Sequence, residues 1–239
     1  MPDGVVAYGL LIALAIALLV AAFTDLRHRR IGNGLNLAIA LAAPAYWWAS
    51  GLGLSGIVWQ LGIAAVVFAV SLALFARGSM GGGDVKLLVA LALWLPPVNY
   101  AQLIFMMAVI GGAMSIFAGA RNLRIAPDER APRLLAAAAT ALWLLGSVYV
   151  VRVMNGAAPF DAAAAARAIA PAWLGAALVY GALAAGFVVL VAGARTIARR
   201  QRGRLKIPYG LAISVAGLWV LASEFLPGFT SAAATQVVG

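Results

Sequence analysis

The chain contains no cysteine and a single histidine, His28. These absences exclude disulfides, thiolate metal sites, a cysteine nucleophile and a histidine-rich metal centre. Charged residues are also scarce, at 10% of the 239 residues, whereas a soluble domain carries roughly a quarter. Because 65% of the residues are apolar, lipid is the expected solvent for most of the chain.

Long apolar runs indicate membrane-spanning helices. A helix rises about 1.5 Å per residue, so roughly 20 apolar residues cross a hydrocarbon core of about 30 Å. Seven runs approach this length: Val5–Phe23, Leu35–Trp48, Ile57–Phe75, Tyr100–Ala118, Leu134–Val151, Trp173–Ala194 and Pro208–Leu226. We therefore expect an all-α fold, a polytopic helical bundle in the membrane.

A shorter run, Val85–Leu95, is an eighth candidate span that ends at Pro96-Pro97. Such a short helix is tolerated within a membrane where protein surrounds it. The sequence thus predicts about eight transmembrane helices, with six to eight possible.

The basic residues predict the orientation. Of the 17 Lys and Arg residues, 15 fall in alternate loops, and only Arg152 and Arg167 fall in the opposite ones. The positive-inside rule places the basic loops in the cytoplasm. The net charge of +10 then reflects topology and contact with anionic membrane lipids, and nucleic acid is not an expected partner.

No linker, internal repeat or soluble domain is apparent in the pattern. We expect a single membrane-embedded domain over residues 1–239, with a flexible tail over 227–239. Residues 155–170 are mostly alanine and predict a short surface helix capped by Asp161.

The seven carboxylates differ in their surroundings. Five have an ordinary structural explanation as tail, loop, cap or interfacial groups: Asp3, Asp128, Glu129, Asp161 and Glu224. The other two, Asp25 and Asp84, each lie at the predicted cytoplasmic end of an apolar segment. Two acids at the same depth in the membrane, on different helices, can lie close together. The free-energy cost is moderate, because a charged side chain is less costly near the interface than at the bilayer centre. Asp25 and Asp84 are the candidate catalytic pair.

Simpler interpretations of the pair stay open. Asp84 opens a helix and would be a favourable group at its N-terminus. Asp25 would form ion pairs with the arginines that follow it. The run Gly81-Gly82-Gly83 before Asp84 favours an active-site loop, because glycine permits unusual backbone conformations and close approach of another chain.

The residues around both acids resemble the type IV prepilin peptidases, membrane aspartic proteases of the GxGD class. Asp25 precedes Ile31-Gly32-Asn33, similar to the family's D-x(5)-I-P-N stretch. Asp84 closes Gly81-Gly82-Gly83-Asp84 and is followed by Val85-Lys86-Leu87. The stretch Ile207-Pro208-Tyr209-Gly210 is similar to the opening of the family's last helix.

The chain departs from the family pattern in two places. Gly32 replaces the usual proline, which predicts a looser turn after Asp25. The region 120–206 matches no part of the family pattern and is predicted to add extra helices. Without cysteines, the chain lacks the zinc-binding domain of the long bifunctional members. It is therefore similar to the short, peptidase-only form associated with tight-adherence (Flp/Tad) pili.

The resemblance implies an aspartic endopeptidase that needs no cofactor or metal. Its substrates would be prepilins and pseudopilins of the Flp-like type, whose short basic leader is removed at the cytoplasmic side of the bacterial inner membrane. Asp25 and Asp84 would share one proton, so that one activates water while the other protonates the scissile carbonyl oxygen.

Several neighbours are candidate supporting residues of the loop or the substrate site: Gly81, Gly82, Gly83, Lys86, Asn33, Pro208, Tyr209 and Gly210. Lys86 either holds the anionic pair or anchors the helix at the interface. Asn33 either hydrogen-bonds the Asp25 loop or caps the second span. Tyr209 is a candidate for substrate contact or for an interfacial aromatic.

Two other classes of function are compatible with the pattern. A proton- or cation-coupled transporter would use Asp25 and Asp84 as ion ligands, although transporters place such groups near the bilayer midplane. In a non-catalytic scaffold both aspartates would be dispensable.

Overall fold

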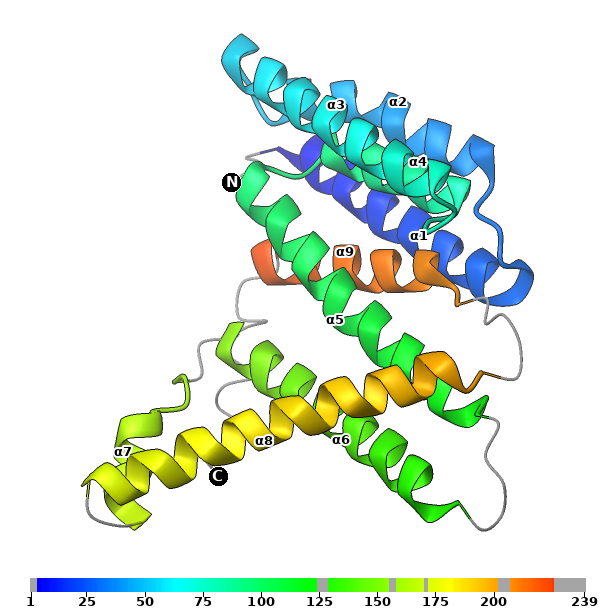
Figure 1. The fold of residues 1–239 in the computed structure, drawn as a ribbon. Helices are drawn as coiled ribbons and strands as arrows, with labels where there is room; N and C mark the ends of the chain where they lie inside the picture. The colour runs from blue at the N-terminus through cyan, green and yellow to red at the C-terminus, as the bar shows by residue number, and fades with distance from the viewer. Residues whose placement is uncertain (1–3, 124–128, 155–157, 170–171, 202–206, 226–239) are drawn as a thin grey trace. The chain divides into compact units, whose positions relative to one another are not determined.

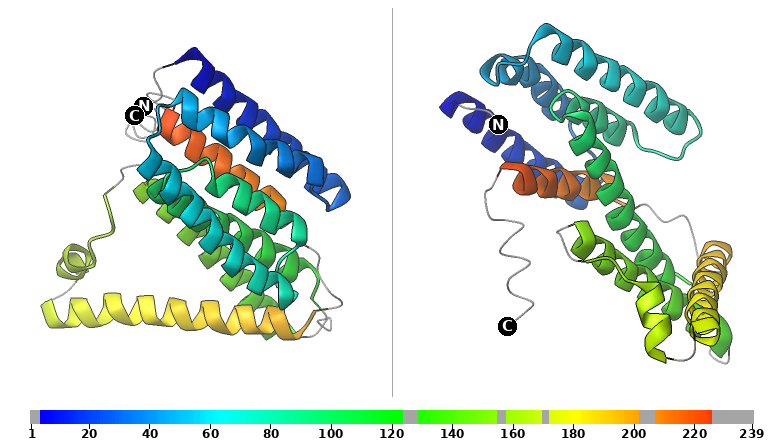
Figure 2. Two further views of the ribbon diagram at one scale, coloured as in Figure 1. Left: turned by 90° about the horizontal axis from the view of Figure 1, so that it is seen from above. Right: turned by 90° about the vertical axis from the view of Figure 1, so that its left-hand side faces the viewer.

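A computed structural model describes residues 4–123, 129–154, 158–169, 172–201 and 207–225. Within these ranges the chain is helical apart from turns and one isolated bridge between Leu123 and Gln201. The helices are α1 (Val5–His28), α2 (Asn33–Ala49), α3 (Leu54–Ala76), α4 (Gly82–Ala92), α5 (Pro97–Arg121), α6 (Arg130–Met154), α7 (Ala162–Ile169), α8 (Ala172–Arg199) and α9 (Tyr209–Phe225). Figures 1 and 2 trace them along the chain.

The expected all-α membrane bundle is confirmed. Among the described residues, five helices are long and apolar enough to cross a membrane: α1, α3, α5, α6 and α8. The helices α2, α4 and α9 are shorter and follow the other three predicted runs. The shortest helix, α7, is the predicted surface helix, and the carboxylate of Asp161 accepts the N–H of Ala164 at 2.9 Å as its N-cap.

The contacts between helices divide the chain into two units. The first unit joins residues 4–111 with residues 208–225, and α9 packs there against α1 and α4. The second unit holds the described residues between 112 and 207, which include α6, α7 and α8. The second unit thus contains most of the region that the family pattern does not explain.

In the first unit, α4 is the best-buried element. It packs against α2, α3 and α9, and the side chains of Leu87, Leu88 and Leu91 are at most 2% exposed. Its environment explains how a helix of 11 residues is accommodated, because neighbouring helices replace lipid around it.

Two carbonyl groups at and just after the C-cap of α4 accept hydrogen bonds from neighbouring helices. The last carbonyls of a helix have no partner within it. Here the indole N–H of Trp47 donates to the Leu93 carbonyl at 2.7 Å, and the amide nitrogen of Gln60 donates to the Leu95 carbonyl at 2.7 Å. Side chains from α2 and α3 thereby stabilise the break before Pro96-Pro97.

In the second unit, α8 packs against α6 and α7. Leu123, Ala136 and Ile197 form a small buried cluster there. An exposed ion pair joins Arg200 to Glu129, which agrees with the structural interpretation of that carboxylate.

Candidate active site

Asp25 lies in the last turn of α1, because the helix continues past the apolar run to His28. Its side chain is only 6% exposed. The carboxylate oxygen Oδ2 accepts the backbone N–H of Leu211 at 3.0 Å, and the amide of Gly210 is a second backbone donor. Both amides belong to the first turn of α9.

This contact gives α9 an N-terminal cap from another helix. The first amides of a helix have no partner within it, and a side chain at the N-cap position commonly supplies one. In α9 that position precedes Tyr209 and is occupied by Pro208, whose side chain has no acceptor. Asp25 supplies the missing acceptor, and the positive end of the α9 dipole in turn favours a negative charge on Asp25.

Gly210 is explained by the space around Asp25. A Cβ atom at this position would lie 2.5 Å from Cδ1 of Ile31 and 2.8 Å from Oδ2 of Asp25. Any larger residue would therefore push the first turn of α9 away from the carboxylate. The Pro208-Tyr209-Gly210 motif thus holds the backbone of α9 against Asp25.

Tyr209 lies beside this contact and is 38% exposed. Its ring covers Gly111 of α5, where an added Cβ would come within 2.9 Å of Cε1. Within the first unit, Tyr209 therefore packs α9 against α5, while part of its surface stays accessible.

Asp84 lies in the first turn of α4, three residues after the N-cap Gly81. Its carboxylate accepts the backbone N–H of Gly81, which is one half of the reciprocal arrangement known as a capping box. The prediction that Asp84 would serve its own helix terminus is therefore correct, although the N-cap residue itself is Gly81. This structural role leaves the second carboxylate oxygen for other chemistry.

The two carboxylates interact electrostatically. Burial away from water is the main cause that raises the pKa of Asp84 from 3.8 to about 6, and the negative charge of Asp25 raises it further. The hydrogen bond from Gly81 opposes both effects. A carboxyl group with this pKa holds its proton in part near neutral pH, as an acid catalyst requires.

The glycine run before Asp84 makes room for neighbouring side chains, and its backbone dihedral angles are ones that any residue can adopt. Gly81 has φ −75° and ψ 145°, and the positive-φ glycines of the described chain are Gly51 and Gly78. The run Gly81–Gly83 therefore does not use the unusual backbone conformations that glycine permits. A Cβ at Gly81 would lie 2.9 Å from the Asp84 carboxylate, and one at Gly83 would lie 3.3 Å from Cβ of Ile31.

Gly82 faces a different neighbour, the ring of Phe75 at the end of α3, at 3.4 Å from an added Cβ. The close approach permitted by the glycines is therefore made by the chain's own side chains. Ile31 is 7% exposed and lies against both Gly83 and Gly210. It thereby connects the first turn of α4, which contains Asp84, to the first turn of α9, whose amides bind Asp25.

Lys86 and Asn33 form one contact at the rim of this region. Nζ of Lys86 donates to Oδ1 of Asn33 at 2.7 Å in an exposed position. Asn33 is the first residue of α2, whose N-cap is Gly32, so the predicted capping role of Asn33 was wrong. The pair connects the start of α2 to the first turns of α4.

Asn36 is a residue of the site that the sequence analysis missed. It is 4% exposed, and its Nδ2 donates to the carbonyl of Gly83 at 3.3 Å. Its Oδ1 is buried with no hydrogen-bond partner among the described residues. Asn36 could have been identified from the sequence, because it is a polar amide residue within the apolar run Leu35–Trp48.

The site has the parts of a two-carboxylate centre. Asp25 and Asp84 come from different helices, and each is held by backbone amides. Over the described residues, no group of three His, Asp or Glu side chains is arranged to hold a metal ion. The arrangement is therefore suited to proton transfer and activation of water.

A comparison with protein families gives one match. The model of the Type IV leader peptidase family (Peptidase_A24) matches residues 12–116. The matched range includes both Asp25 and Asp84, and the resemblance predicted from the sequence is confirmed over that range. Searches of curated proteins and of solved structures gave no significant match.

Proposed function

We propose that this protein, whose matched family is one of leader peptidases, is a prepilin leader peptidase with Asp25 and Asp84 as its catalytic pair. The observation that carries the proposal is the electrostatic coupling of two carboxyl groups from α1 and α4, both partly or fully removed from water. Two such groups cannot both ionise readily, so the pair holds one proton near neutral pH.

The hydrogen bonds and charges around the two aspartates favour different protonation states. Burial disfavours the charged form of both acids. Asp25 is compensated by amides from Leu211 and Gly210 and by the charge of Arg29, whereas Asp84 receives one amide, from Gly81. In the singly protonated pair the negative charge therefore rests on Asp25 and the proton on Asp84. The pair still titrates jointly, so a measured pKa belongs to both groups.

The reaction follows from this division. Asp25 removes a proton from a water molecule as its oxygen attacks the scissile carbonyl carbon. Asp84 donates its proton to the carbonyl oxygen, which gives a neutral tetrahedral gem-diol. Asp25 then gives its proton to the leaving nitrogen while Asp84 takes a proton back from a gem-diol hydroxyl. The C–N bond breaks, the leader acid and the mature pilin amine are released, and the singly protonated pair is restored.

The substrate and the membrane side follow the family resemblance and the charge pattern. We propose that the substrate is a Flp-like prepilin with a short basic leader and an apolar helix, cut at the cytoplasmic face of the inner membrane. The basic residues Arg27, Arg29 and Arg30 close to Asp25 support that side through the positive-inside rule.

Co-expression with a Flp-type prepilin tests the proposal. The pilin's gel mobility is followed for the wild type, Asp25→Asn and Asp84→Asn, with Asp161→Asn as the matched control. Shortening of the pilin by the wild type and the control alone supports both assignments. Equal cleavage by all four proteins would show that the aspartates are structural.

A further inference from the structure

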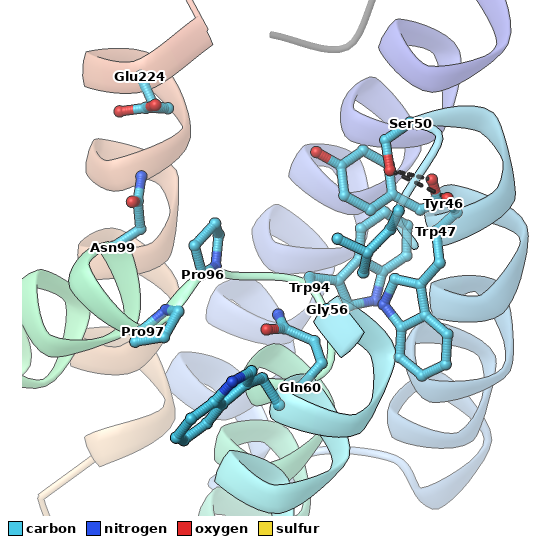
Figure 3. A pocket seen from close by; sticks show the side chains of 12 residues that line it. Tyr46, Trp47, Ser50, Gly56, Gln60, Trp94, Pro96, Pro97, Asn99 and Glu224 are labelled. Carbon is cyan, nitrogen blue, oxygen red and sulfur yellow. Dashed lines mark hydrogen bonds between the residues drawn. The ribbon is translucent and has the colours of Figure 1, made fainter. Parts of the chain in front are cut away.

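A cavity of about 730 Å³ lies within the first unit, at the end of the helices away from Asp25 and Asp84. It is formed where α2 ends, α3 begins and α4 turns into α5, together with the last turn of α9 (Figure 3). Tyr46 follows the first residue of α2 by 13 positions, which is about 20 Å along a helix. The cavity is within the size range of small-molecule sites, and nothing in the proposed catalytic chemistry uses it.

Aromatic side chains form much of its wall: Tyr46, Trp47, Trp59 and Trp94. The indole N–H of Trp47 donates to the Leu93 carbonyl at 2.7 Å, and that of Trp94 donates to the Ile39 carbonyl at 2.8 Å. The rings of Tyr46 and Trp94 are stacked, with centroids 5.1 Å apart. These contacts hold Tyr46, Trp47 and Trp94 in place without a ligand, and the wall that they form is largely apolar.

Glu224 and Gln60 offer acceptor oxygens to the cavity, beside the amide of Asn99 and the hydroxyl of Tyr46. Glu224 is the charged residue among those that line it, and no Lys or Arg is among them. Gln60 is 6% exposed, and its amide nitrogen is engaged with the Leu95 carbonyl. The amide oxygen is therefore the polar atom that Gln60 offers. Figure 3 shows Glu224 and Asn99 across the cavity from Tyr46 and Ser50.

The aromatic wall together with the acceptor oxygens of Glu224 and Gln60 favours a cation that carries N–H donors. A carboxylate and an amide oxygen accept such donors, and an ammonium group is further attracted to the faces of Trp and Tyr. An anion would meet the charge of Glu224 with no basic side chain to offset it.

The surroundings of the cavity indicate where its ligand comes from. Trp59 lines the cavity and is 71% exposed. At the end of α2 and the start of α3, Trp48 and Leu54 are 82% and 79% exposed. Exposed Trp beside apolar spans is typical of the level of the lipid head groups. A ligand that enters past Trp59 therefore comes from the bilayer interface.

We propose that this cavity binds the primary ammonium head group of an aminophospholipid. The ammonium lies between Glu224 and the amide oxygen of Gln60, its ethylene group lies against the aromatic wall, and the phosphate stays in the head-group layer. The acyl chains run along the exposed face of α3. The proposal concerns lipid binding alone and does not depend on peptidase activity.

Native mass spectrometry of the full chain, released from detergent, tests the proposal. The protein is incubated with equal amounts of phosphatidylethanolamine, phosphatidylcholine and phosphatidylglycerol with identical acyl chains. We expect the ethanolamine lipid to be retained preferentially. Glu224→Gln should weaken that retention about tenfold, because a charge-assisted hydrogen bond is lost.

A matched pair of tryptophan variants provides a second measurement. Trp59→Leu should weaken retention of the ethanolamine lipid. Trp48→Leu changes a tryptophan that is also largely exposed but does not line the cavity, and it should leave retention unchanged. Melting of each variant in detergent confirms that it is folded. Because both tryptophans are largely exposed, neither change removes a core side chain.

Free ethanolamine separates the two sources of the ammonium group. Weak competition by millimolar ethanolamine supports recognition of the ammonium in a lipid. Ethanolamine binding as tight as that of the lipid would overturn the lipid assignment. Equal retention of all three lipids, or retention unchanged in Glu224→Gln and Trp59→Leu, would show only general lipid adhesion and would overturn the proposal.

Discussion

The carboxylate of Asp25 accepts the backbone N–H of Leu211 across 186 positions of sequence. This hydrogen bond joins the end of the first helix to the start of the last described one. It brings an acid and a helix N-terminus together, so that the same contact completes the capping of α9 and stabilises negative charge on Asp25. The packing of α9 and the proposed chemistry are therefore coupled.

Cleavage should depend on pH through the proton on Asp84. The pKa of Asp84 is about 6, so the protonated fraction falls as the pH rises above that value. If Asp84 is the acid, the rate at low substrate should fall about tenfold per pH unit on the alkaline side. Initial rates of prepilin cleavage in detergent from pH 5 to 8 measure this; a flat profile would contradict the assignment.

Stability should respond to the same proton. The pKa of Asp84 in the folded chain is above its ordinary value of 3.8, so the folded state binds the proton more tightly than the unfolded state. Its contribution to stability is complete below pH 3.8 and is lost as the pH rises through about 6. Melting temperatures of the wild type should thus fall over that interval more than those of Asp84→Asn, which has no such proton. Parallel curves would contradict this prediction.

Gly210→Ala should abolish most cleavage. The new methyl group would meet Cδ1 of Ile31 and the carboxylate of Asp25, and relief of these contacts moves the amides of α9 away from Asp25. Gly34→Ala is the matched control, because an added Cβ there meets nothing within 4 Å and alanine favours a helix by about 0.5–1 kcal/mol over glycine.

Prepilin cleavage and melting temperature are measured together for both glycine variants. We expect Gly34→Ala to keep its activity and to melt no lower than the wild type. The double variant Gly210→Ala with Ile31→Ala should recover part of the lost activity, since it removes one of the two clashes. Full activity of Gly210→Ala alone would show that the close packing is unnecessary.

Asn36→Ala should slow catalysis with little effect on substrate binding. The variant removes the hydrogen bond to the Gly83 carbonyl, which positions the residue next to Asp84. The Gly83 carbonyl keeps its helical partner in α4 and loses one additional hydrogen bond. Such a bond contributes about 0.5–1.5 kcal/mol, so we expect a loss of up to roughly tenfold in kcat.

Asn33→Ala is the control for this prediction, because Asn33 contacts Lys86 at an exposed position. We expect its kcat to stay within about twofold of the wild type, since exposed polar contacts contribute little. The measurement is kcat and KM for a prepilin peptide. An unchanged kcat for Asn36→Ala, or a change confined to KM, would rule out the positioning role.

Gly32→Pro should stabilise the protein. Gly32 has φ −63° and ψ 137°, which proline adopts without strain, and no atom lies within 4 Å of an added Cβ. Proline restricts the unfolded chain, and a gain of about 0.4–1 kcal/mol is expected. Thermal melting checks it. The folded backbone at Gly32 already has the dihedral angles of proline, so the greater freedom that glycine gives this turn is a property of the unfolded chain. A lower melting temperature of Gly32→Pro would contradict this prediction.

The sequence determined the membrane class, the helical fold and the approximate bounds of the helices. These follow from apolar runs whose length matches the bilayer, a one-dimensional property that needs no partner. It also selected Asp25 and Asp84 as candidates, because acids beside apolar spans are costly and their surroundings resemble a family motif.

Only the tertiary structure decided what supports these acids. The approach of Gly210 to Asp25, of Ile31 to Gly83 and of Asn36 to the Gly83 carbonyl depends on how separate helices pack. A sequence pattern shows that glycine is present, but the atom that occupies the freed space comes from elsewhere in the chain. The aromatic cavity beside Glu224 likewise exists only in the folded chain, because its lining residues come from α2, α3, the turn between α4 and α5, the start of α5, and α9.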